Sequence, residues 1–230
     1  MNRLTLFPRG DRLAPELVAR FRSLPTPVVS DASERSHGAV GLSPVGECLT
    51  ALRTRIVAGP ALTVRTRPGD NLVVHKALEL TEPGDVLVVD ARGELTNAIV
   101  GELMALYARE RGVAGIVVDG AVRDSHELSE GVLPIFARGV SHLGPFKSGP
   151  GEIHGTVHIG GAVVHDGDLV VADADGVTFV AAQRAAEVAS AAEAIVALER
   201  EIRRAILDGT WDRSWIDPAL EIVEPAAGDD

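Results

Sequence analysis

The chain has 230 residues, 46% hydrophobic and 24% charged, which are the proportions of a folded globular protein rather than of a disordered or coiled-coil chain. The net charge of −11, from 22 basic and 33 acidic residues, argues against nucleic acid as a partner, because binding to phosphate backbones requires clustered basic side chains. No apolar run is long enough for a membrane span, the N-terminus lacks the apolar segment of a secretory signal and the single Cys48 permits no internal disulfide, so we expect a cytoplasmic protein without a membrane partner.

The first third of the chain is predicted to contain short helices and strands. Apolar residues at helical spacing predict an amphipathic helix over residues 15–24, ended by two prolines. Residues 28–31 indicate a brief strand that opens a helix, and residues 56–66 indicate an extended segment broken by a turn at Gly59–Pro60. Asp70 is the expected N-cap of a helix that continues to residue 80.

The middle of the chain carries the pattern of a parallel sheet. Two continuous apolar runs, 86–90 and 114–119, are typical of strands buried on both faces, and a helix that ends near Gly112 separates them. Such β–α–β steps imply parallel pairing, with helices covering at least one face of the sheet. The fold class predicted here is therefore α/β.

The rest of the chain divides into a glycine-rich β region and a long helix. Short predicted strands lie at residues 134–138, 157–159, 162–165, 169–172 and 177–180. A long helix is predicted over 183–207, with an acidic tail behind it. We therefore expect one α/β domain over residues 1–182 and a C-terminal helix and tail over 183–230.

The segment that follows the 114–119 strand carries the strongest candidate chemistry. It reads Asp-Gly-Ala-Val-Arg-Asp-Ser-His-Glu over residues 119–127 and combines carboxylates with one guanidinium. Ligands bind at the carboxyl ends of parallel strands in α/β proteins, and the consecutive Arg123 and Asp124 can face an anion and a cation respectively. Alternatively, the two residues form a surface ion pair, and Asp124 is the N-cap of the following helix.

A second candidate element begins at Gly101. If this glycine starts a helix, the amides of Glu102, Leu103 and Met104 are unpaired and can bind a carboxylate. Alternatively, Gly101 lies inside a helix that starts at Asn97, where it costs about 1 kcal/mol. The periodicity of the sequence fits both arrangements.

Taken together, these residues resemble the signature of the RraA-like family. Glu102 is followed by twenty residues, then by Arg123–Asp124, and then by Glu127. Further matching blocks lie at residues 29–32, 59–61, 83–85, 115–120 and 167–168, so the resemblance runs from about residue 28 to residue 180. The family includes divalent-metal-dependent 4-hydroxy-4-methyl-2-oxoglutarate/4-carboxy-4-hydroxy-2-oxoadipate aldolases and the regulator of ribonuclease activity A. The resemblance implies a layered β/β/α swivelling-type fold, assembled as a homotrimer or homohexamer with sites at subunit interfaces.

The resemblance also implies roles for the central residues. Asp124 would be the direct ligand of Mg²⁺ or Mn²⁺, and Arg123 would lie against the C2 oxygen of the substrate. Glu102 would hold waters of the cation and relay the proton of the C4 hydroxyl. The main chain at Gly101, Leu103 and Met104 would receive the C1 carboxylate.

Three further residues occupy family positions that line the pocket and receive the substrate's distal carboxylate. They are Asn71, His75 and Lys147. Asn71 and His75 are four residues apart and share a helix face, although capping or surface exposure explains both equally well. Lys147 is one of only two lysines in the chain, the other being Lys76.

Glu199 is the candidate residue of the C-terminal helix. It lies on the same stripe as several isoleucines, where an unpaired carboxylate is costly. In family aldolases this helix packs on the neighbouring subunit and supplies a carboxylate to the metal's water shell, which the resemblance assigns to Glu199. An i,i+4 ion pair with Arg203 is the alternative.

The resemblance therefore implies a metal-dependent pyruvate aldolase, a lyase that cleaves a 4-hydroxy-2-oxo acid such as 4-hydroxy-4-methyl-2-oxoglutarate to pyruvate and a second oxo acid. Oxaloacetate decarboxylation is expected as a side activity, because it passes through the same pyruvate enolate. The alternative is a non-catalytic RraA-type regulator that binds a ribonuclease or helicase. Many members have Asp where this chain has Glu102, which leaves the choice of substrate open.

Overall fold

The computed structural model describes residues 2–34, 38–46, 56–129 and 133–223, so Cys48 and the end of the acidic tail lie outside the described residues. The helices are α1 (Pro15–Phe21), α2 (Thr26–Ala32), α4 (Leu72–Leu80), α5 (Glu102–Glu110), α6 (Ser125–Ser129) and α7 (Ala185–Leu207), with 3₁₀ turns at Ala182–Arg184 and Asp217–Ala219. The strands are β1 (Leu4–Leu6), β2 (Ser43–Pro44), β3 (Val57–Thr66), β4 (Val86–Val100), β5 (Gly115–Val122), β6 (Ile135–Val140), β7 (Gly151–Ile153), β8 (Val157–Ile159), β9 (Ala162–Val164), β10 (Leu169–Asp173) and β11 (Gly176–Val180).

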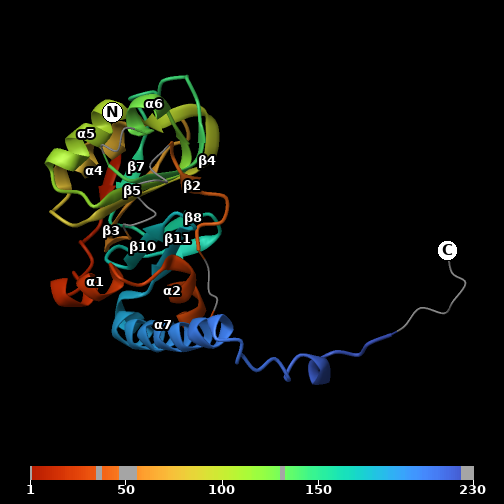
Figure 1. Ribbon diagram of the computed structural model, residues 1–230. Coiled ribbons are helices and arrows are strands. Elements are labelled where there is room, and N and C mark those ends of the chain that lie inside the picture. Colours follow the sequence, from red (N-terminus) through yellow and green to blue (C-terminus); the bar gives the residue numbers. More distant parts are fainter. Residues whose placement is uncertain (1, 35–37, 47–55, 130–132, 224–230) are drawn as a thin grey trace, which may run out of the picture.

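These elements stack in layers (Figure 1). The central sheet has the strand order β1-β7-β3-β4-β5-β6-β2, and its four middle strands are parallel. Helices α4, α5 and α6 lie on one face of this sheet, while β10, β11 and the β8–β9 hairpin lie on the other. Helices α1, α2 and α7 cover the outer side of β10 and β11. The prediction of an α/β fold with layered sheets is confirmed. Helices α1, α2 and α7 form a further layer.

Alternation along the central strands explains why these segments are apolar throughout. In β4, Leu87 and Val89 pack into the core beneath α4 and α5, whereas Val86 and Val88 pack into the core between the sheets. In β5, Ile116 packs into the core beneath the helices and Val117 packs into the core between the sheets. Since side chains point alternately to the two faces of a strand, a strand covered on both sides requires apolar residues at every position.

Strand β3 connects the two sheets, and here the predicted turn at Gly59–Pro60 is wrong. Residues 57–60 pair with β10 in antiparallel register, and from Ala61 onward the strand pairs with β4 in parallel. The strand changes partners at this dipeptide without ending. A side chain at position 59 would meet the carbonyl oxygen of Gly84 at 2.2 Å, so glycine is required by this close approach rather than by a turn.

Residues 28–31, predicted as a strand, are helical and belong to α2. Pro25 and Pro27 begin this helix instead of ending the preceding one, which agrees with the tolerance of proline in a first helical turn. The amide of Thr26 donates to Asp173 Oδ2 at 2.8 Å. A carboxylate 147 residues away in sequence therefore stabilises the start of α2.

The C-terminal helix begins as part of the core and ends away from it. The buried residues of α7 are Ala185, Val188, Ala189 and Ala192, and they pack with α1 and α2. Beyond them Leu198 and Leu207 are exposed, as is Trp215 in the tail that leads away from the layers (Figure 1). Within the described residues, no helix combines the length and the apolar character needed to cross a membrane.

Candidate functional site

The candidate site lies where β4 and β5 end side by side. Both strands are longer than predicted, and Val100 at the end of β4 is paired with Val122 at the end of β5. The segments that follow them, Gly101 with α5 and Arg123 with Asp124, therefore start at the same edge of the sheet. This is the edge at which α/β folds place ligands.

Gly101 is the N-cap of α5, which decides between the two arrangements that the sequence allowed. Its backbone is extended, with φ −139° and ψ −174°, so the conformation itself does not require glycine. The surroundings do: a Cβ at this position would lie 2.4 Å from Asp124 Oδ2 and 3.1 Å from Arg123 Cγ. Gly101 thus allows Arg123 and Asp124 to approach the main chain at the start of α5.

Asp124 contacts the N-terminus of α5 rather than capping its own helix through its side chain. Asp124 Oδ2 accepts a hydrogen bond from the amide of Glu102 at 3.0 Å and lies 3.6 Å from Arg123 Nε. The side chains of Arg123 and Asp124 are 43% and 39% exposed. The ion pair considered from the sequence is therefore present, and the cap is made on a different helix.

The amides at the start of α5 are not equivalent. The Met104 amide donates to the carbonyl of Gly101 at 3.1 Å, so the helix already uses it. For the Leu103 amide, no acceptor is found among the described residues. Since the Glu102 amide donates to Asp124, the Leu103 amide is the one of the three expected amides that remains available.

The opposite wall of the site is built from α4 and the loop before β7. Asn71 is buried, and its Nδ2 donates to the carbonyl of Ile99 at 3.0 Å. Lys147 Nζ donates to Asn71 Oδ1 at 3.2 Å and to His75 Nε2 at 3.1 Å. Because an ammonium group only donates, His75 Nε2 must accept, and the imidazole proton is on Nδ1.

This environment also determines the charge of His75. Partial burial, and secondarily the positive charge of Lys147, lower the pKa of His75 below its ordinary value of 6.5. The imidazole is therefore neutral near pH 7. Lys147 is then the positively charged group on this wall, and Asn71 and His75 hold its ammonium in place.

These residues enclose a cavity of about 130 Å³. Drug-sized ligands occupy pockets of roughly 300–1,000 Å³, so this cavity suits a small molecule. The predicted site residues that line it are Asn71, His75, Gly101, Leu103, Met104, Arg123, Asp124 and Lys147. Glu102 is adjacent, because its backbone amide donates a hydrogen bond to Asp124 Oδ2.

Glu199 does not reach this cavity within the chain. It is exposed on α7, on the side of the molecule away from α5 and α6 (Figure 1). The described part of the chain shows no ion pair between Glu199 and Arg203 either. Its place near a neighbouring site remains a prediction about the assembly.

Asp119 also lies apart from the site, contrary to the grouping suggested by the 119–127 segment. It belongs to β5 and is buried, with Arg138 Nε at 2.6 Å from Oδ1 and the Gly160 amide at 2.8 Å from Oδ2. The ion pair with Asp119 raises the pKa of Arg138. Asp119 therefore joins β5 to β6 and to the β8–β9 hairpin rather than binding a ligand.

The Gly144–Pro145 segment before Lys147 forms part of the site, although nothing in the sequence indicated that it lines the cavity. Pro145 lines the cavity, and a Cβ on Gly144 would lie 3.0 Å from Arg123 Nη1. The Gly–Pro dipeptide marks a loop in the sequence. Its contact with Arg123 depends on the tertiary structure.

The donor set limits the type of metal that could bind. Among the described residues, no group of three or more His, Cys, Asp or Glu side chains forms a closed metal cage. Asp124 contributes one carboxylate at an accessible position, and Glu102, in the first turn of α5, provides a second carboxylate nearby. This fits Mg²⁺ or Mn²⁺, since Mg²⁺ keeps several waters and is commonly held by one or two carboxylates together with substrate oxygens.

Comparisons with known proteins place the chain in a family. The model of the RraA-like family, described as Aldolase/RraA, matches residues 26–179. A protein of Halalkalibacterium halodurans named "Putative 4-hydroxy-4-methyl-2-oxoglutarate aldolase" is 38% identical over 166 residues, covering 72% of this chain and 76% of that protein.

Two solved structures titled as RraA proteins are also similar. Streptomyces coelicolor RraAS2, described as an unusual member of the RNase ES inhibitor RraA family, has a TM-score of 0.75 and 30% identity over 84% of this chain and 98% of its own. The RNA-processing inhibitor RraA from Thermus thermophilis has a TM-score of 0.60 and 32% identity over 68% of this chain and 92% of its own.

Proposed function

Because the chain belongs to the RraA-like family of aldolases and RraA proteins, we propose that it is a divalent-metal-dependent aldolase. Its substrate would be a 4-hydroxy-2-oxo acid such as 4-hydroxy-4-methyl-2-oxoglutarate, cleaved to pyruvate and a second oxo acid. The observation that carries the proposal is the position of Arg123 and Asp124 at the start of α5, in a small cavity with Lys147 on its opposite wall. The aldolase name of the Halalkalibacterium relative supports it.

The two walls suit the two ends of a dicarboxylic substrate. The free Leu103 amide and the positive end of α5 would receive the C1 carboxylate. The ammonium of Lys147, held by Asn71 and His75, would bind the distal carboxylate. The substrate would then lie between these walls with its C2 oxygen toward Arg123.

Arg123 would stabilise the negative charge that forms on the C2 oxygen when the C3–C4 bond breaks. Its guanidinium offers several N–H donors in a fixed plane, and charge-assisted hydrogen bonds are stronger than neutral ones. The carboxylate of Glu102, in the first turn of α5, would accept the proton of the C4 hydroxyl through an intervening water. The half that contains C4 leaves as the second oxo acid, and the other half is released as pyruvate after its enolate takes up a proton at C3.

Asp124 would hold the divalent cation, with Glu102 contacting waters around it. One oxygen, Oδ2, already accepts the Glu102 amide, and no hydrogen bond from the described residues to Oδ1 is found. Mg²⁺ or Mn²⁺ bound there would supply Lewis acidity for the oxo-acid group. Oxaloacetate decarboxylation is proposed as a side activity, because it develops the same charge on the same C2 oxygen.

A coupled assay tests this function directly. Pyruvate release from 4-hydroxy-4-methyl-2-oxoglutarate and from oxaloacetate is measured with Mg²⁺, with EDTA, and with Mg²⁺ restored. We expect activity to disappear in EDTA and return with Mg²⁺. Arg123→Ala should lower kcat by roughly 10²–10³-fold, as the loss of an oxyanion donor does.

The matched control is Arg109→Ala, an exposed residue in the last turn of α5 that pairs with Glu110 and lies outside the cavity, and this variant should retain turnover. Near-normal turnover of Arg123→Ala would contradict the assigned role. Trapping of pyruvate on Lys76 or Lys147 by borohydride would contradict the metal mechanism, because it reveals a Schiff base.

The second candidate is a non-catalytic regulator that binds a ribonuclease or helicase. It is favoured by the similarity to RraAS2, which extends over 84% of this chain. That structure covers more of the chain than the Thermus RraA does, so chain length alone does not separate the two functions. Absence of turnover with every 4-hydroxy-2-oxo acid tested, together with binding to such a partner, would favour this candidate.

A further inference from the structure

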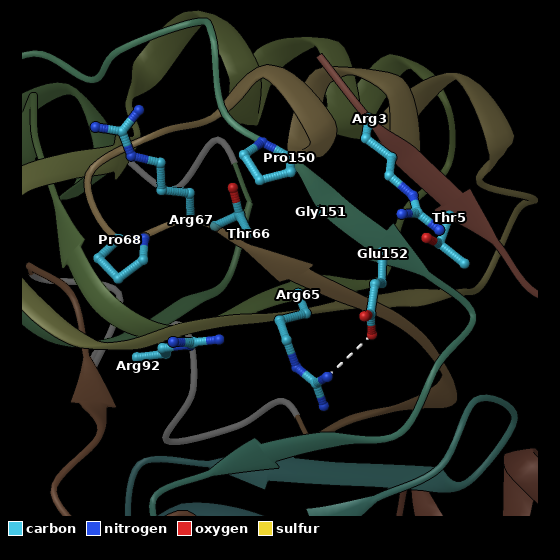
Figure 2. Close-up of a pocket in the computed structure, with 10 residues that line it drawn as sticks. All are labelled: Arg3, Thr5, Arg65, Thr66, Arg67, Pro68, Arg92, Pro150, Gly151 and Glu152. Carbon is cyan, nitrogen blue, oxygen red and sulfur yellow. Dashed lines mark hydrogen bonds and ion pairs between the residues drawn. The ribbon is translucent and has the colours of Figure 1, made fainter. Parts of the chain in front are cut away.

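A cavity of about 550 Å³ lies outside the candidate site and shares no lining residue with it. Four arginines line this cavity: Arg3 just before β1, Arg65 in β3, Arg67 just after β3 and Arg92 in β4. In Figure 2, the side chains of Thr5 in β1 and of the preceding Arg3 lie on one side of the cavity. Arg65 lies beside Glu152 of β7, and Arg92 belongs to β4. Glu152 is the one acidic residue among those lining the cavity.

Only one of the four arginines is neutralised by the surrounding protein. Arg65 Nη1 lies 2.9 Å from Glu152 Oε2, its Nε lies 3.5 Å from Asp90 Oδ2, and its remaining nitrogen donates to the carbonyl of Thr156. Within the described ranges, no carboxylate lies within ion-pair distance of Arg3, Arg67 or Arg92. Arg67 instead lies over the ring of Phe146, 5.9 Å from its centroid.

Several arginines elsewhere in the described chain are instead held by carboxylates. Arg9, Arg20 and Arg138 each lie within 2.8 Å of a carboxylate oxygen. The chain has 33 acidic and 22 basic residues, so carboxylates are in excess. In this acidic chain, three guanidinium groups without an ion pair to the described residues gather around one hollow, and their mutual repulsion favours an anion between them.

We propose that this cavity is a binding site for a small organic molecule with two phosphate or carboxylate groups. The planar donor fork of arginine matches the oxygens of both groups. The volume falls within the roughly 300–1,000 Å³ of pockets for drug-sized ligands, so this cavity can hold a larger molecule than the candidate active site can. The hydroxyl of Thr5, which also lines the cavity, adds a neutral donor.

The spacing of the strands indicates two anionic groups rather than one. Strands β1 and β4, which carry or adjoin Arg3 and Arg92, are separated by β7 and β3 in the sheet. At about 4.8 Å between neighbouring strands, their axes are roughly 14 Å apart. A molecule with one anionic group at each end can contact arginines on both sides.

Calorimetric titration of the intact chain tests the proposal without any assay of activity. The probes are fructose 1,6-bisphosphate, citrate and orthophosphate, the first two of which distinguish phosphate from carboxylate recognition. We expect fructose 1,6-bisphosphate or citrate to bind with one site per chain and at least about tenfold more tightly than orthophosphate. The affinity should fall as salt is added.

The test variant is Arg3→Gln with Arg92→Gln, neither of which breaks an ion pair of the described structure. It should weaken binding at least about tenfold, the effect of losing charged hydrogen bonds. The matched control is Arg200→Gln with Arg203→Gln on α7, which removes the same charge at exposed positions away from the cavity. The control should bind within about twofold of the wild type.

Three results would overturn the proposal. The first is that neither fructose 1,6-bisphosphate nor citrate binds at millimolar concentration. The second is an equal loss of affinity in both double variants, which indicates only general attraction by charge. The third is that Arg3→Gln with Arg92→Gln changes the number of subunits in the assembly but leaves probe binding unaltered. That result indicates that the arginines belong to an interface between copies of the chain. None of these results bears on the proposed aldolase function.

Discussion

At the residue scale, Asp124 combines two tasks that can be separated by mutation. Its backbone is in the left-handed region, with φ 58°, a conformation that Asp tolerates better than most residues. This conformation accompanies a side chain that points to α5, where Oδ2 accepts the Glu102 amide. The carboxylate is thus both a cap for α5 and the proposed ligand of a cation.

Asp124→Asn should separate the cap from the charge. The amide oxygen can still accept from Glu102, so we expect the free energy of unfolding to stay within about 0.5 kcal/mol of the wild type. Asp124→Ala loses the cap and should cost about 1 kcal/mol. Both should lose Mg²⁺-dependent pyruvate release, as measured by the coupled assay alongside urea unfolding. Retained activity in Asp124→Asn would exclude a role for the charge.

The second prediction at this scale concerns pH. The pKa of His75 is lowered in the folded chain, so its neutral form is favoured by folding and the unfolded chain takes up a proton first as the pH falls. The stability contributed by neutral His75 is present above the ordinary value of 6.5 and declines as the pH drops below it. We therefore expect the wild type to lose stability relative to His75→Gln between about pH 7 and pH 5.

Urea unfolding of both proteins across this pH range measures the difference. A difference that stays constant, or that changes in the opposite direction, would contradict the assigned state of His75. Lys147→Met serves as the control, because removing the neighbouring positive charge should raise the pKa of His75 and reduce the pH dependence.

At the scale of elements, the start of α5 is built around the absence of a side chain at Gly101. Gly101→Ala is compatible with the extended backbone, but its Cβ would lie 2.4 Å from Asp124 Oδ2. The carboxylate must therefore move, and we expect roughly 1–3 kcal/mol of destabilisation together with loss of activity. Thermal unfolding and the pyruvate assay measure the two effects.

The matched control for this prediction is Gly139→Ala in β6. Its Cβ would meet only the flexible end of Leu95, at 3.2 Å. We expect this variant to keep its activity. If Gly101→Ala behaved in the same way, close packing of Asp124 against Gly101 would not be needed for function.

At the scale of the whole molecule, the second half of α7 has no apolar partner within the described chain. Leu198, Ile206 and Leu207 are 55%, 50% and 81% exposed, although the same helix is buried at its start. We predict that this surface packs on a neighbouring subunit in a trimer or hexamer and brings Glu199 to that subunit's site. Exposed apolar surface of this kind is typical of interaction sites.

Leu198→Glu with Ile206→Glu should therefore reduce the number of subunits measured by light scattering. The matched control is Val163→Glu in β9, an equally exposed apolar residue at 54% that lies outside the helix. We expect the control to keep the assembly of the wild type. Unchanged assembly in the double variant would contradict the predicted packing of the helix.

The sequence predicted the parallel strands of the central sheet because a strand buried on both faces is apolar at every position, which appears in the sequence as a continuous apolar run. It failed at α2 and at Gly59–Pro60 because both depend on distant partners. The amide of Thr26 bonds to Asp173, and the main chain at Gly59 approaches Gly84. Local propensity carries no information about such contacts, since the partners are far away along the chain.

For the site, the sequence alone determined which residues are present and how Arg123, Asp124 and Glu102 are spaced, because these are properties of the chain order. Only the tertiary structure decided that Gly101 starts a helix, that Asp124 caps that helix, and that Lys147 faces them from another loop. The same is true of the arginine-lined cavity, whose residues belong to strands that are neighbours in the sheet but far apart in sequence. The physical reason is that pairing of strands and packing of side chains fix distances across the fold, whereas residue order fixes distances only along the chain.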